Sequence, residues 1–174
     1  MKRILASLAV TLPLAAVAAW TDGAGKPIPD TPSMRSSGDF GAQLVLTASE
    51  KEFRRVWHST TGTPRLQAVD TIRQGQSISA VIVFSGCTPG MDGACKVAVD
   101  FVLQSPDGSR MPAGSGPVWS RAPQKPPLLL LGDASVTLGF GLDDAPGRYT
   151  LLATVTDAIA GRTLRLALPF AVTK

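Results

Sequence analysis

The chain has few of the residues that carry catalytic chemistry. Its 174 residues include two cysteines, one histidine and one tyrosine. The histidine, His58, stands in a polar stretch without a partner that a motif would identify, and a catalytic triad needs such an orienting group. A Gly-x-Ser-x-Gly elbow is also absent. We therefore expect no catalytic residue, no cofactor and no enzymatic activity; a hydrolase or metal carrier centred on His58 is the competing hypothesis.

Metal ligands are equally scarce. Zinc motifs need further Cys or His close to the cysteine pair, and none is present. Met91 and Met111 suggest copper, because thioethers suit Cu(I) and some small copper carriers are β-sandwiches. One histidine with scattered methionines is a poor ligand set, so we expect no metal site. A periplasmic copper carrier stays open as an alternative function.

One apolar run stands out, and it is too short to span a membrane. It covers residues 4–14, follows the basic Lys2 and Arg3, and leads into a run of small residues. A bilayer span needs roughly 20 apolar residues. The order of these segments is typical of a secretory signal peptide. We expect residues 1–19 to be that signal, cleaved after Ala18 or Ala19, with no transmembrane segment in the remaining chain.

Charge of one sign is not in large excess. Loss of Lys2 and Arg3 with the signal leaves 15 basic against 13 acidic residues, a net charge of +2. That is too little to favour nucleic acid or an anionic membrane surface. We expect no nucleic-acid partner.

The two cysteines, Cys87 and Cys95, enclose a short loop of turn-forming residues. Outside the cytoplasm such a pair oxidises and remains oxidised. We expect one disulfide, contributing roughly 2–3 kcal/mol by the chain-entropy argument. The expected location is the periplasm of a Gram-negative bacterium, or the exterior.

Residues 20–39 are rich in Gly, Pro, Ser and Asp, and this composition predicts a flexible leader. The folded domain is expected over residues 40–174. Ser49 and Glu52 match a capping box, and they predict a short helix over 49–57. The remaining segments alternate apolar and polar residues between turn signals, which predicts an all-β sandwich of about seven or eight strands. Residues 112–127, which hold five prolines, are expected to form a long surface connection.

The segment from Asp144 to Leu151 resembles the Asp-x-x-Gly-x-Tyr-x-Cys stretch of immunoglobulin-like domains. The resemblance implies an antiparallel immunoglobulin-like sandwich in which Tyr149 forms a tyrosine corner, with Leu151 replacing the usual core cysteine. The layout also resembles an uncharacterised family of small exported bacterial proteins, which implies no known activity. The residues that carry this second resemblance are Ser85-Gly86-Cys87, Asp100-Phe101, Pro106-Asp107-Gly108, Trp119 and Gly147-Arg148-Tyr149.

The proline-rich segment holds the candidate partner-binding residues. Trp119, Arg121 and Lys125 combine an aromatic side chain with cations, the composition of binding hot spots. Trp119 is either an anchor for a partner or a lid on the core. The sequence therefore predicts an exported, non-enzymatic binding or accessory module of the bacterial envelope, whose partner is an envelope protein or polymer. A protease inhibitor on the same scaffold is a further alternative.

Overall fold

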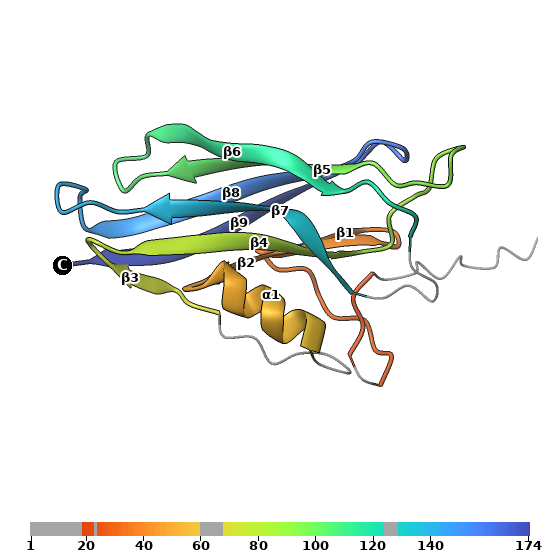
Figure 1. Cartoon of the computed structure of the whole chain (residues 1–174), viewed down its shortest axis with the longest axis horizontal. Helices are drawn as coiled ribbons and strands as arrows, with labels where there is room; N and C mark the ends of the chain where they lie inside the picture. The colour runs from red at the N-terminus through yellow and green to blue at the C-terminus, as the bar shows by residue number, and fades with distance from the viewer. Residues whose placement is uncertain (1–18, 23, 60–67, 124–128) are drawn as a thin grey trace, which may run out of the picture.

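The fold is known from a computed structural model, which describes residues 19–22, 24–59, 68–123 and 129–174. Two sheets stack face to face, with the strand orders β1-β2-β4-β7 and β3-β9-β8-β5-β6 (Figure 1). The elements are β1 (Met34–Ser37), β2 (Phe40–Thr47), α1 (Glu50–Ser59), β3 (Thr71–Arg73), β4 (Ser77–Ser85), β5 (Val97–Gln104), β6 (Arg110–Trp119), β7 (Leu130–Gly139), β8 (Gly147–Asp157) and β9 (Arg162–Thr173).

The predicted fold class, an all-β sandwich with one short helix, is confirmed. The neighbours β2-β4-β7 and β9-β8-β5 follow the strand order of immunoglobulin-type sandwiches. All pairings between these strands are antiparallel, whereas β3 pairs parallel with β9. The main core lies between the sheets and includes Phe40, Phe84, Phe101 and Leu151, each almost fully buried.

Tyr149 lies near the start of β8, where the resemblance to immunoglobulin-like domains places it. Its hydroxyl donates a hydrogen bond to the Ala145 carbonyl at 2.9 Å, which is the bond that a tyrosine corner makes. Burial raises the pKa of the Tyr149 hydroxyl, and the charges of Asp144 and Asp107 raise it further. The hydroxyl therefore remains protonated and able to donate at physiological pH.

Helix α1 begins after Ser49, as the capping box predicts. The Ser49 Oγ accepts a hydrogen bond from the Glu52 amide at 3.3 Å. Phe53 then points onto the outer face of the β1-β2-β4-β7 sheet, where it is 4% exposed. Because α1 covers this face, β2 and β4 are buried on both sides, and this explains the nearly continuous apolar sequence of β4.

The prediction of a flexible leader over residues 20–39 is wrong. Strand β1 lies within it, and Trp20 is only 5% exposed. Trp20 packs on the outer face of the sheet in a second apolar cluster. Its indole Nε1 donates to the Arg35 carbonyl at 3.2 Å. Gly41 allows this close approach, because a methyl group there would lie 2.7 Å from the indole nitrogen.

The prediction of an irregular connection over residues 112–127 is wrong for its first half. Residues 110–119 form the edge strand β6 beside β5. The register shifts between Phe101 and Val102, opposite Pro112, and again between Val97 and Ala98, opposite Pro117. These bulges and the edge position accommodate residues that cannot donate a ladder hydrogen bond. The structure therefore has nine described strands instead of seven or eight.

The predicted signal peptide lies outside the described residues, except for Ala19. In the described part of the chain, no helix has the length and apolar character to cross a bilayer. The Cys87–Cys95 disulfide is present, as predicted. Such a bond fits an oxidising compartment outside the cytoplasm.

Candidate functional site

Several connections meet at one end of the sandwich, which we call the disulfide end. Strands β4, β6 and β8 end there and β5, β7 and β9 begin there, as their pairing registers show. In Figure 1 it is the right-hand end, opposite the C-terminus. Its described segments are the Cys87–Cys95 loop, residues 158–161, residues 38–39 and residues 120–123.

The Cys87–Cys95 loop is held by its own hydrogen bonds as well as by the disulfide. The Gly90 amide donates to the Ala94 carbonyl at 2.8 Å, and the Gly93 amide donates to the Gly90 carbonyl at 2.9 Å. The Asp92 carboxylate accepts from the Ala94 amide at 3.1 Å. A tight turn therefore presents Met91 at its tip, where the side chain is fully exposed.

A buried carboxylate ties this loop to the turn between β8 and β9. Asp157 is fully buried, and its Oδ2 accepts a hydrogen bond from the Thr88 amide at 2.9 Å. Its Oδ1 accepts from the amides of Ile159 at 3.2 Å and Ala160 at 3.4 Å. These three donors replace the water that a buried charge loses. Asp157 therefore fixes the two turns relative to each other.

Asp157 belongs to no motif that would mark it as a site residue in the sequence. A signal was present, because Asp157 continues the inward alternation of Tyr149, Leu151 and Val155 along β8. A charged residue in an inward position at the end of a strand needs donors nearby. The adjacent turn and the cysteine loop supply them.

The turn between β1 and β2 packs closely on the start of the cysteine loop. Gly86 has a φ of 73°, and a methyl group there would lie 1.8 Å from the Asp39 carbonyl oxygen. The Asp39 carboxylate also pairs with Arg162 at the start of β9. A side chain at position 86 is therefore excluded both by conformation and by space.

Trp119 acts as a lid on the core at this end. It is 8% exposed and packs against Phe84, with ring centroids 5.7 Å apart. The Arg121 guanidinium covers its face at 3.8 Å from the ring centroid and pairs with Asp133 at 3.0 Å. Of the predicted binding residues, Trp119 is thus buried, Arg121 is exposed beside it, and Lys125 lies outside the described residues.

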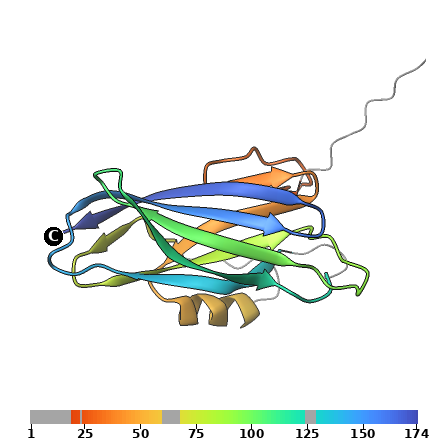
Figure 2. The same cartoon turned by 90° about the horizontal axis from the view of Figure 1, so that it is seen from above.

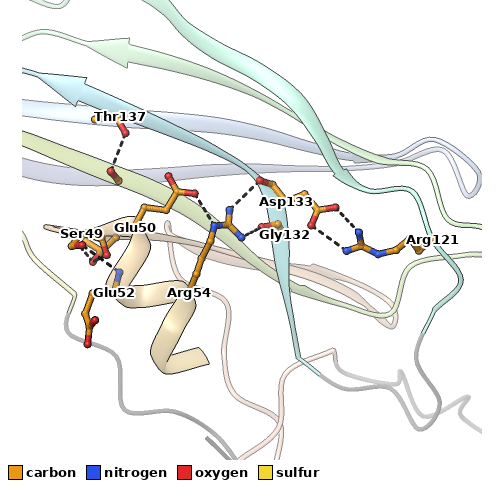
Figure 3. A network of polar contacts seen from close by, with 10 residues as sticks. Ser49, Glu50, Glu52, Arg54, Arg121, Gly132, Asp133 and Thr137 are labelled. Atoms are coloured by element: carbon orange, nitrogen blue, oxygen red, sulfur yellow. Dashed lines mark hydrogen bonds and ion pairs between the residues drawn. The ribbon is translucent and has the colours of Figure 1, made fainter. Parts of the chain in front are cut away.

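A network of polar contacts connects this lid to α1 (Figure 3). Arg54 pairs with Glu50 at 2.7 Å and donates to the carbonyls of Gly132 and Asp133, each at 3.0 Å. Burial raises the pKa of the Glu50 carboxyl, but hydrogen bonds from Arg54 and Ser135 outweigh it and lower the pKa overall. The charged pair fastens α1 to the edge strand β7, so we assign this network a structural role.

Three of the six exposed large apolar side chains in the described residues, Met91, Leu129 and Ile159, lie toward the disulfide end. Met111 and Leu142 lie toward the opposite end, and Ile28 lies in the segment before β1. The Ile159 Cδ1 would lie 3.3 Å from a methyl group at Gly90, so Ile159 sits directly beside the cysteine loop. The disulfide end therefore presents apolar side chains on a prearranged backbone.

The residues considered for metal chemistry lie apart. Met111 is near the far end of β6, eight residues and on the order of 25 Å of strand from the disulfide end, where Met91 lies. His58 is exposed in the last turn of α1, outside the β1-β2-β4-β7 sheet. No group of three or more His, Cys, Asp or Glu side chains that could hold a metal occurs within the described ranges.

Searches of protein-family models and of curated protein sequences gave no match. Two solved structures are similar at low levels. One is a Pseudomonas fluorescens alkylpurine DNA glycosylase, AlkC, bound to DNA, with 14% identity, a TM-score of 0.38, and coverage of 60% of this chain and 28% of that chain. The other is a family 123 glycoside hydrolase from Clostridium perfringens, with 11% identity, a TM-score of 0.39, and coverage of 76% and 27%. The chain thus spans less than a third of either protein.

Proposed function

We propose that this chain is an exported, non-enzymatic binding module of the bacterial envelope and that it holds a partner protein at the disulfide end. The observation that carries the proposal is the full exposure of Met91 at the tip of a loop held by a disulfide. An apolar side chain is costly to leave in water. Because the loop is already fixed by the disulfide, it loses little conformational entropy when a partner covers Met91, and this favours binding.

The chemistry of this surface favours a protein over a charged polymer. Methionine and other apolar residues are enriched in the centres of protein interfaces, with charges at the rim. Met91 and Ile159 supply the apolar part. Lys96 and Arg121 are exposed nearby and supply charges for a rim.

The cysteine loop does not support the protease-inhibitor alternative. A protease cleft binds an extended segment, whereas residues 90–93 form a tight turn closed by a hydrogen bond from the Gly93 amide to the Gly90 carbonyl. The copper alternative is not supported either, since Met91 and Met111 are far apart. We therefore propose the binding function alone.

Capture from an envelope fraction tests the proposal. The full chain, purified in its oxidised form, is immobilised and exposed to the envelope proteins of a bacterium that carries it. We expect a defined set of proteins to be retained, and Met91→Asp to reduce their recovery at least tenfold, because a charge replaces the apolar contact.

Leu142→Asp is the matched control, since Leu142 is an exposed apolar residue in a turn at the opposite end. It should retain the same set as the unmodified chain. Equal recovery with Met91→Asp and with the unmodified chain would exclude this loop as the contact. Equal losses with both variants would indicate non-specific apolar adsorption instead.

A further inference from the structure

The outer face of the five-stranded sheet is uncovered by any described segment. Seen from above in Figure 2, the long strands β5, β6, β8 and β9 lie open, with α1 beneath the other sheet. In the register of these strands, Leu151 and Leu166 point into the core, so their neighbours along each strand point outward. This outward surface, which we call the open face, consists of parallel rows of side chains that run across the strands.

One row across the middle of the open face is apolar. The pairings place four residues in line, and they are Pro112 on β6, Val102 on β5, Leu152 on β8 and Ala167 on β9. The last three are half-buried by their neighbours, and Pro112 is exposed. A partner that covered this row would remove apolar surface from water.

The adjacent row carries two opposite charges. It consists of Ser115 on β6, Asp100 on β5, Thr154 on β8 and Arg165 on β9. Asp100 and Arg165 are exposed, and neither belongs to an ion pair in the described part of the chain. They lie one strand to either side of β8, at equal distances from it.

We infer that the open face is a dimer interface and that its partner is a second copy of this chain. The two-fold axis runs parallel to β8 and passes between the two copies directly over that strand. Rotation about it keeps each row at the same position along the strands and exchanges the β5 side of the row with the β9 side. Asp100 of one copy then faces Arg165 of the second copy, and the reverse pair forms at the same time. The same rotation places Leu152 against Leu152 of the second copy and Val102 against Ala167, whereas Pro112 lies outside the overlap.

The size of the face sets the strength of this dimer. Because the axis lies on β8, only β5, β8 and β9 of one copy meet the β9, β8 and β5 strands of the other. Three strands and five rows cover about 14 Å by 27 Å, or on the order of 750 Å² in total for two copies. That is smaller than a stable specific interface and has the size of a weak, transient one. Arg148 lies at the end of β8 that is far from the disulfide end, and near the axis. It therefore faces Arg148 of the second copy, and the repulsion between the two positive charges weakens the dimer. We therefore expect a weak dimer, with a dissociation constant of about 100 μM or above.

This axis has a consequence for the proposed binding function. Because it runs along the strands, both disulfide ends lie at the same end of the dimer. Two Met91 loops then face the same direction and can engage a partner that carries two sites, which raises avidity without a new contact. The dimer itself does not depend on that function, since the open face and the disulfide end share no contact residue.

Sedimentation velocity of the full oxidised chain at increasing concentration tests the inference. We expect a reversible monomer–dimer equilibrium. Asp100→Arg and Arg165→Asp should each weaken it at least tenfold, because each variant places like charges opposite each other. An equimolar mixture of the two variants should dimerise as strongly as the unmodified chain, since both ion pairs then form between unlike copies.

Leu152→Glu should abolish the dimer, and Lys51→Asp, on the exposed side of α1, should leave it unchanged. Circular dichroism of each variant verifies that the sandwich is folded. A chain that stays monomeric at the highest concentration contradicts the inference. So does a dimer that neither charge variant weakens, and so does a mixture that stays as weak as the single variants.

Discussion

Replacing Asp157 with alanine is expected to lower the free energy of unfolding by about 3 kcal/mol. The fully buried carboxylate accepts hydrogen bonds from the amides of Thr88, Ile159 and Ala160. Hydrogen bonds to charged groups contribute about 1.5–3 kcal/mol each and are not additive, and the exposed turn amides regain water after the change. Urea titration of the oxidised protein measures the loss.

Two further variants separate this role from a general effect of losing an aspartate. Asp157→Asn keeps one carbonyl oxygen and should lose about half as much stability. Asp107→Ala removes a carboxylate that accepts from the Ser109 amide in the exposed turn between β5 and β6, and it should lose much less. A loss below about 1 kcal/mol for Asp157→Ala would show that the two turns are not held together by this group.

The second large effect is expected at Trp20. Trp20→Ala should lower the free energy of unfolding by about 3 kcal/mol, which is the lower end of the range for a buried tryptophan, because it lies near the start of the described chain. The change removes the contacts with the apolar cluster on the outer face of the sheet and the hydrogen bond to Arg35. Thermal unfolding of both proteins, followed by far-UV circular dichroism, measures the difference.

Trp20→Phe is the matched control. It keeps an aromatic side chain without the indole N–H and should lose about 1 kcal/mol, the value of one hydrogen bond with some packing. If Trp20→Ala were as stable as the unmodified chain, the Trp20 side chain would not hold the segment before β1 on the sheet.

The sequence predicted those parts of the fold that local patterns determine. Alternation along Val97 to Leu103 and along Tyr149 to Val155 follows from the period of a strand with one buried face. The capping box at Ser49 depends on neighbouring residues only. The disulfide could be predicted because the two cysteines are close in sequence and the compartment is expected to be oxidising.

The parts that the sequence did not predict depend on contacts between distant segments. Trp20 is buried because Phe53 of α1 and Val81 of β4 form a cluster outside the sheet, and no local pattern encodes that cluster. The prolines of residues 110–119 disfavour a strand because they cannot donate a ladder hydrogen bond. An edge position and two bulges nevertheless accommodate Pro112 and Pro117 in β6.

The candidate site could be predicted only in part. The sequence identified Trp119 as important but left its role open, since a lid and an anchor have the same composition. The structure buries Trp119 beneath Arg121. The sequence marks Met91 only as a thioether, and the fold places it at the tip of a fixed turn.

A photoreactive amino acid at position 91 tests the central proposal most directly. In irradiated cells of a bacterium that carries the chain, we expect a discrete covalent adduct with an envelope protein. The same probe at position 142 should give none. Adducts from both positions alike, or from neither, would contradict a partner at the disulfide end.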